Sequence, residues 1–208
     1  MFNFFNGKGN AVARLLQTAV VLVAIVIAMG GAANLAARVR STAWLAPPQA
    51  VSPAINPVCQ SLFDASDKLY GTPYHMYSTQ TSPQIDSGKP KAAETISVGG
   101  KLYIMTNGKW AASPVSLPEE KQLEQRNRKN ATNLSCHYLF DDTADGEKAS
   151  VYSAHSETER GSNDNQVWIS KDKGLILRQE TDMNIGGGRA TAHVSARYEY
   201  DNVQAPPL

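Results

Sequence analysis

The fold is decided by one stretch of this 208-residue sequence, Val167-Trp168-Ile169-Ser170-Lys171-Asp172-Lys173-Gly174-Leu175-Ile176-Leu177-Arg178. Aliphatic and aromatic residues stand on both sides of a short polar break, and such residues favour pleated, half-buried strands. Asp172-Lys173-Gly174 is typical of a turn, because Asp and Gly are common turn residues. We therefore predict two antiparallel strands, over residues 166–171 and 175–183.

Further strands are expected on both sides of this hairpin. Gly99-Gly100 and Asn107-Gly108 predict tight hairpin turns, because their residues tolerate the positive φ that two-residue turns demand. From Tyr74 onward alternate residues would point to opposite faces, as on a strand. The other strands that we predict cover residues 94–98, 101–105, 109–112, 134–140, 148–156 and 191–200.

Two helices are expected beside these strands. The first has one apolar stripe at helical spacing and ends at Gly71 and Pro73. The second begins at Pro118 and runs to about Ala131, and its polar sequence predicts a surface position. The fold class is therefore α+β: an N-terminal hydrophobic helix, then a strongly curved antiparallel sheet of eight or nine strands, covered by one or two helices. The stripe of the first helix consists of Cys59, Leu62, Phe63, Ser66, Leu69 and Tyr70.

The N-terminal segment is directed to a membrane. Residues 15–37 contain no ionisable group, and 23 such residues are enough to cross a bilayer as a helix. Gly31-Ala32-Ala33 resembles a signal-peptidase site. Because basic residues flank both ends, the sequence leaves open whether the segment is a cleaved signal peptide or a retained inner-membrane anchor.

The rest of the chain is expected to form one extracytoplasmic domain, in the periplasm or tethered to the inner membrane. Residues 41–208 carry sixteen basic and nineteen acidic side chains, a net charge of −3, which disfavours a nucleic-acid partner. The predicted divisions are residues 1–40 for the signal peptide or anchor, 41–57 for a proline-rich linker, 58–203 for the β domain and 204–208 for a tail.

The two cysteines, Cys59 and Cys136, both follow the hydrophobic segment. Two widely spaced cysteines lack the spacing of a zinc or redox site, and in an oxidising compartment they usually pair. We predict a disulfide, and two buried free thiols are the alternative.

The sequence resembles the outer-membrane lipoprotein-carrier-like superfamily. The resemblance lies in the order of helices and hairpins, in Gly-Lys-Leu-Tyr-Ile and Gly-Lys-Trp, and above all in the hairpin over residues 167–178. That group includes periplasmic lipoprotein chaperones and mycobacterial lipid-binding lipoproteins, and a nearer resemblance is to proteobacterial exported proteins of about this size. It implies an incomplete β-barrel closed by helices over an apolar cavity that holds acyl chains.

Aromatic residues occur on nearly every predicted strand and could line such a cavity. They could equally form the core against which the first helix packs. We expect Trp110 and Trp168 to border the cavity, since each stands beside a hairpin turn. The residues predicted to bind a lipid or acyl ligand are Tyr103, Trp110, Trp168, Leu62, Phe63 and Leu69.

A hydrolase or metal enzyme is the rival hypothesis, and it rests on His155 and Glu157. Alternation places both side chains and Glu159 on one strand face, where they could bind a metal or pair a base with an acid. Such a row is also typical of the solvent side of a strand. The sequence has no nucleophile elbow, zinc-protease motif or phosphate loop, so no enzyme, cofactor or metal site is predicted. A ligand-free cell-envelope interaction module is the third possibility.

Overall fold

The computed structural model describes residues 56–83, 88–158, 161–185 and 190–208. The hydrophobic segment 15–37 and nearly all of the predicted linker lie outside these residues. Neither helix of the described part is long and apolar enough to cross a bilayer.

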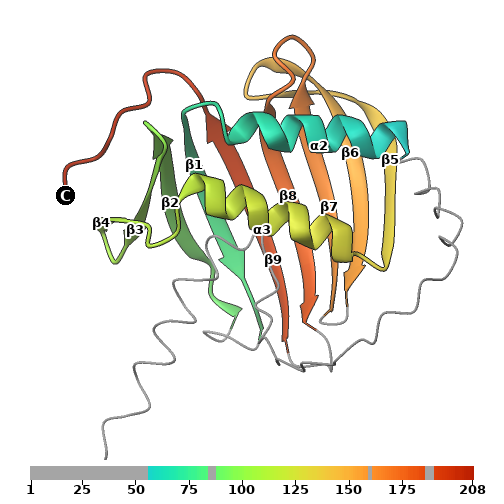
Figure 1. Ribbon diagram of the computed structural model, residues 1–208, viewed down its shortest axis with the longest axis horizontal. Helices are drawn as coiled ribbons and strands as arrows, with labels where there is room; N and C mark the ends of the chain where they lie inside the picture. The colour runs from blue at the N-terminus through green and yellow to red at the C-terminus, as the bar shows by residue number, and fades with distance from the viewer. Residues whose placement is uncertain (1–55, 84–87, 159–160, 186–189) are drawn as a thin grey trace, which may run out of the picture.

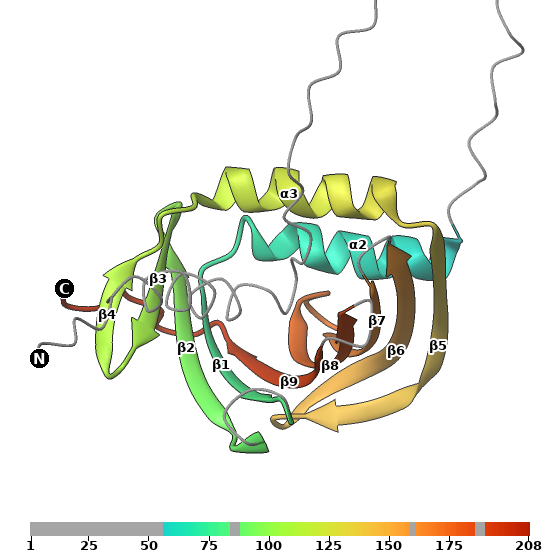
Figure 2. The same ribbon diagram turned by 90° about the horizontal axis from the view of Figure 1, so that it is seen from below.

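Nine antiparallel strands form one sheet in the order β4-β3-β2-β1-β9-β8-β7-β6-β5. Two hairpin meanders build it, and the first and last strands, β1 and β9, join them at the centre. The outermost strands, β4 and β5, do not pair with each other, so the sheet is a trough and not a closed barrel (Figures 1 and 2). The strands are β1 (Tyr74–Thr81), β2 (Lys91–Val98), β3 (Lys101–Thr106), β4 (Lys109–Ala112), β5 (Asn133–Ala144), β6 (Glu147–Thr158), β7 (Gly161–Ser170), β8 (Ile176–Ile185) and β9 (Ala190–Glu199).

The helices α2 (Pro57–Leu69) and α3 (Leu117–Asn130) lie over the concave side of the sheet (Figure 2). The Asn56 side chain accepts a hydrogen bond from the Val58 N–H at 3.0 Å, and proline occupies the first helical position of α2. At the start of α3 the Glu119 carboxylate accepts from the Ser116 N–H at 2.8 Å. Both helices therefore begin at the capping residues that their sequences offer.

The main core fills the space between α2 and the middle of the sheet. Apolar side chains of α2 meet inward residues of β1, β5, β7, β8 and β9, together with Leu117 of α3. Cys59 and Cys136 join α2 to β5 by a disulfide, as the sequence predicts. A second, smaller cluster lies on the opposite face of the sheet and consists of Ala144, Ala149, Val151, Trp168 and Leu177.

Candidate functional site

A partly open cavity of about 180 Å³ lies between the two helices and strands β5 to β8. Four elements of the sheet supply its floor and the facing sides of α2 and α3 supply its roof. Its lining residues are Leu62, Phe63, Ser66, Glu124, Asn127, Arg128, Ala131, Leu134, Cys136, Ala154, Ser156, Thr158, Asn163, Asn165, Val167, Ile176, Gln179 and Thr181.

The lining combines an apolar part with an uncharged polar part. The apolar part consists of Leu62 and Phe63 of α2, the disulfide at Cys136, and small aliphatic residues of β6, β7 and β8. The polar part lies farther along the same strands from the disulfide. There the alternation of side chains brings hydroxyl and amide groups to the concave face. The polar part consists of Ser156, Thr158, Asn163, Asn165, Gln179 and Thr181.

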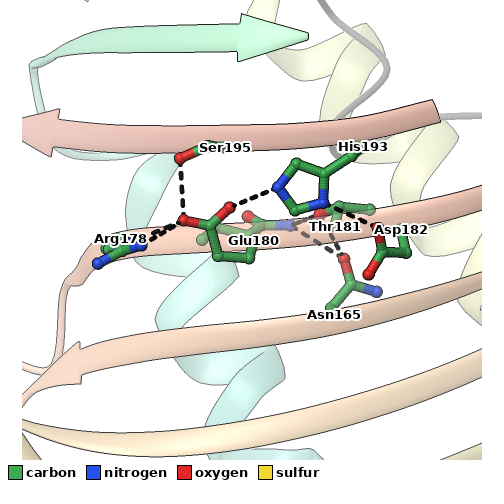
Figure 3. Close-up of polar contacts among 8 residues, drawn as sticks. Asn165, Arg178, Glu180, Thr181, Asp182, His193 and Ser195 are labelled. Atoms are coloured by element: carbon green, nitrogen blue, oxygen red, sulfur yellow. Dashed lines mark hydrogen bonds and ion pairs between the residues drawn. The ribbon is translucent and has the colours of Figure 1, made fainter. Parts of the chain in front are cut away.

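Three of these polar side chains hold one another in place. Thr181 donates from Oγ1 to Asn165 Oδ1 at 2.8 Å (Figure 3). Gln179 donates from Nε2 to the same oxygen at 3.1 Å. Gln179 and Thr181 are buried. The floor of the cavity therefore carries a preorganised, neutral hydrogen-bonding group.

The charged side chains of the lining, Glu124 and Arg128 of α3, are paired with each other. Arg128 donates from Nε to Glu124 Oε1 at 3.0 Å and lies 4.5 Å from the centre of the Phe63 ring. Ser66 and Tyr70 of α2 donate to the two Glu124 oxygens at 2.7 and 2.6 Å. This network joins α3 to α2 and closes one wall of the cavity.

A second buried acid, Glu120, lies one turn before Glu124 on α3. Burial, and to a lesser extent the nearby Glu124 charge, raise the pKa of Glu120 to about 7. Tyr198 of β9 is also buried, and its hydroxyl has no hydrogen-bond partner among the described residues. A buried acid of α3 and an unpaired hydroxyl of β9 therefore add polar groups to the interior between the helices and the sheet.

The predicted ligand residues of α2 fall into two groups. Leu62 and Phe63 line the cavity. Leu69 belongs to the main core at the other end of α2 and does not reach the cavity. The cavity thus lies beneath the middle of α2, from Leu62 to Ser66, and the core is packed beneath Leu69.

Trp168 does not border the cavity, contrary to the sequence prediction. Its strand neighbours Val167 and Ile169 point into the main core, so Trp168 points to the outer face, into the smaller cluster. There Nε1 donates to Asp142 Oδ2 at 3.0 Å, and the Arg178 guanidinium lies 4.8 Å from the ring. This indole stabilises the convex side of the sheet.

Trp110 and Tyr103 are on the outer face as well. The register places Trp110 in one row with Met105, Glu94 and Tyr77, opposite to the inward face of β1. Tyr103 stands two residues before Met105 and so shares its face. Neither residue lines the cavity, and the expectation that aromatic side chains border it is wrong for all three strands concerned.

The outer face of the sheet also holds the residues of the enzyme hypothesis. His155 Nδ1 lies 2.7 Å from Asp164 Oδ1, and its Nε2 lies 3.2 Å from Glu157 Oε1. The hydrogen bond to Asp164, and then the one to Glu157, raise the pKa of His155 above its ordinary value. The described residues contain no group of three side chains that could hold a metal ion.

Similar pairs continue across β8 and β9. His193 Nδ1 lies 2.8 Å from Asp182 Oδ1, and Glu180 accepts from both Arg178 and Ser195 (Figure 3). These charged pairs lie on the exposed convex side of the sheet. These side chains are paired and lie on the face away from the cavity.

The sequence prediction missed the polar part of the cavity. The predicted strand begins at residue 166, whereas β7 already begins at Gly161. Extending the alternation back from Val167 would have brought Asn165 and Asn163 onto the concave face. It also missed Glu124, because a polar helix was expected to lie exposed at the surface.

No protein-family model matches the sequence, and no curated protein shows significant sequence similarity to it. Several solved structures are similar to it. The Mycobacterium tuberculosis lipoprotein LppX is 12% identical with a TM-score of 0.41, over 72% of this chain and 98% of that chain. A putative outer membrane lipoprotein-sorting protein domain from Vibrio parahaemolyticus is 7% identical with a TM-score of 0.26, over 70% and 93% of the two chains.

The chain is also similar to MucB in the complex of Pseudomonas aeruginosa MucA and MucB, at 10% identity and a TM-score of 0.38. That match covers 72% of this chain and 59% of the other, so the chain spans little more than half of that relative. These three proteins are a lipoprotein, a putative lipoprotein-sorting domain and one member of a two-protein complex. The ligand of this chain is therefore inferred from its own side chains.

Proposed function

We propose that the chain is an extracytoplasmic binding domain that holds the apolar part of an amphiphile in the cavity beneath α2 and α3. One observation carries this proposal: the lining passes from aliphatic side chains to uncharged hydrogen-bonding ones within a single cavity. Ligand sites typically combine an apolar wall with a few placed polar groups. The end of the cavity at Leu62 would hold the hydrocarbon part of the amphiphile. Asn165 and Thr181 would face the neutral polar part of the same molecule.

The size of the cavity limits what it takes in. Its volume of about 180 Å³ is close to that of the cavity of roughly 150 Å³ that accepts benzene in an engineered protein. Pockets for whole drug-sized ligands measure about 300–1,000 Å³. The cavity in this form therefore accommodates a few carbons of an acyl chain, and the remainder would lie along its open side.

The proposed location is the periplasm, with the domain either released or tethered to the inner membrane. The hydrophobic segment 15–37 precedes the domain, and the domain contains a disulfide between Cys59 and Cys136. Disulfides of this kind persist in oxidising compartments. A reporter fused after Leu208 should be active only if that reporter requires export.

A ligand-free interaction module remains the second candidate. The outward position of Trp110 and Trp168 and the filled core under Leu69 favour it, because both remove apolar surface that a larger cavity would use. The two candidates differ in one measurable property, which is whether purified protein carries a small molecule.

Native mass spectrometry of protein purified from the periplasm tests the proposal. We expect a bound amphiphile that Ala154→Phe displaces, since Ala154 lines the cavity. Ser153→Phe is the matched control, because the neighbouring side chain on β6 points to the opposite face. Protein that carries no molecule, or a molecule retained equally by both variants, would favour the interaction module.

A further inference from the structure

Exposed hydrophobic side chains gather on one strand. Apart from Leu208, every exposed large hydrophobic residue of the described part lies on β5. We call these four the β5 patch: Leu134, Tyr138, Leu139 and Phe140 are 38%, 50%, 42% and 47% exposed. Scattered apolar residues are ordinary on a surface, but a group of this kind marks a site of protein or membrane contact.

The backbone of β5 disfavours pairing with another strand. β5 is an edge strand, and its register with β6 shifts between Tyr138 and Phe140. Such a bulge disrupts the regular ladder and is one way in which proteins protect an edge from strand addition. Tyr138, Leu139 and Phe140, at this bulge, are all exposed, and Tyr138 and Phe140 pair with residues that point to opposite faces of the sheet. The patch is therefore suited to contact through side chains rather than through the backbone.

Basic residues stand next to the patch. Arg126 and Lys129 are exposed on the last turns of α3, which leads directly into β5 (Figures 1 and 2). Neither makes an ion pair with a described residue. Of the acids at the far end of the patch, Asp141 pairs with Lys171 and Asp142 accepts from Trp168. The cations stand at the Leu134 end of the patch, and a surface that combines exposed cations with aromatic and aliphatic side chains is typical of contact with anionic lipid.

The chain enters the domain at the same strand. Asn56, at the start of the described residues, donates from Nδ2 to the Cys136 carbonyl of β5 at 3.5 Å. Eighteen residues, 38–55, separate it from the hydrophobic segment 15–37. Fully extended, they would reach at most about 60 Å. A chain held in the membrane by that segment could thus bring β5 to the bilayer surface.

We propose that the β5 patch, with Arg126 and Lys129, docks on the surface of an anionic lipid bilayer. Tyr138, Leu139 and Phe140 would enter the headgroup region, and the two cations would lie among the lipid phosphates. Leu134 both belongs to the patch and lines the cavity, so the docked bilayer would lie at the cavity mouth. Docking itself does not require a bound ligand and can hold even where the proposed function fails.

Photocrosslinking tests this with the full chain in vesicles of phosphatidylethanolamine and phosphatidylglycerol. Leu139 is replaced by benzoylphenylalanine, and the matched control carries the same replacement at Lys109, exposed on the opposite edge strand β4. Both chains possess the hydrophobic segment, so only orientation differs between them. We expect lipid adducts on the peptide that contains residue 139, and only a background yield of lipid adducts on the peptide that contains residue 109.

The double substitution Arg126→Glu with Lys129→Glu is combined with benzoylphenylalanine at position 139. It should reduce the yield of lipid adduct to the level of the Lys109 control. Both side chains are exposed, so the variant should keep its disulfide and its thermal unfolding curve. An adduct of residue 139 with a second copy or another protein would overturn the proposal. Equal lipid adducts at 139 and 109, or a yield that the charge reversal leaves unchanged, would overturn it as well.

Discussion

Glu120 is a carboxylic acid that the fold buries on α3, where burial and the Glu124 charge raise its pKa from 4.5 to about 7. The folded state therefore holds a proton that the unfolded state has released between these two pH values. The contribution of Glu120 to the free energy of unfolding is therefore greatest below the pKa of the unfolded state and falls as the pH rises toward 7. At roughly 1.4 kcal/mol per pKa unit, ionisation costs the fold on the order of 3 kcal/mol.

Glu120→Gln should accordingly raise the free energy of unfolding above pH 7, by roughly 2–3 kcal/mol, and change it little at pH 4.5. Urea denaturation at both pH values measures this. Asp172→Asn, in the exposed turn after β7, is the control and should show no such pH dependence. A Glu120→Gln variant that is less stable at pH 8 would show that the ionised form is the one the fold prefers.

Trp168 shows what alternation along a strand can and cannot predict. The alternation of Val167, Trp168 and Ile169 separates two faces, and the structure confirms that separation. Which face is concave depends on where the helices cross the sheet, and that is not a local property. The Trp168 indole also finds Asp142 and Arg178 on the convex side, and both come from other strands.

Helix α3 is held to α2 through the Glu124 carboxylate, which accepts from Ser66, Tyr70 and Arg128. Glu124→Leu should destabilise the protein by roughly 3 kcal/mol, because it leaves the half-buried Arg128 guanidinium with only the more distant and more exposed Asp67, at 3.5 Å, as a charge partner. Thermal unfolding and hydrogen exchange of the α3 amides measure the effect. We expect exchange in α3 to rise more than exchange in β7.

Replacing both partners separates the lost pair from the lost packing. Glu124→Leu with Arg128→Leu should recover much of the loss, since two apolar residues leave no buried charge unpaired. If the double variant is as unstable as the single one, the Ser66 and Tyr70 hydrogen bonds, and not the ion pair, hold α3.

The disulfide between Cys59 and Cys136 joins α2 to the edge strand across 77 residues of sequence. Closing a loop of this length contributes about 4 kcal/mol in the chain-entropy model. Cys59→Ser with Cys136→Ser should therefore lower the midpoint of urea unfolding and loosen the apolar end of the cavity, which both cysteines border or support. Two free thiols in denatured, non-reduced periplasmic protein would contradict the pairing.

Among the elements, those made by local hairpins could be predicted from the sequence. Turn pairs such as Asn107-Gly108, where both residues have positive φ, mark the hairpins correctly. The predicted strands are too short where polar residues face the cavity, as at residues 161–165 of β7. A polar residue on a concave face has the same local pattern as one in a loop, so only the finished sheet distinguishes them.

For the whole molecule, the decisive contact is the pairing of β1 with β9, which converts two meanders into one curved sheet. The sequence predicted eight or nine strands, one or two helices over the sheet and the disulfide, but not this contact between the ends of the domain. Its consequence is functional, because the curvature leaves space between β5–β8 and the helices. The cavity thus arises from topology, which local propensity does not specify.

Methyl NMR with octyl glucoside, a neutral-headed amphiphile, tests the cavity as the ligand site most directly. Below its micelle concentration, the account predicts saturable shifts for the methyl groups of Leu62, Val167 and Ile176, which line the cavity. Val151 and Leu177, in the cluster on the outer face, should stay unchanged. Unchanged signals from the cavity methyls, or equal shifts on both faces, would contradict the claim that this cavity binds an amphiphile.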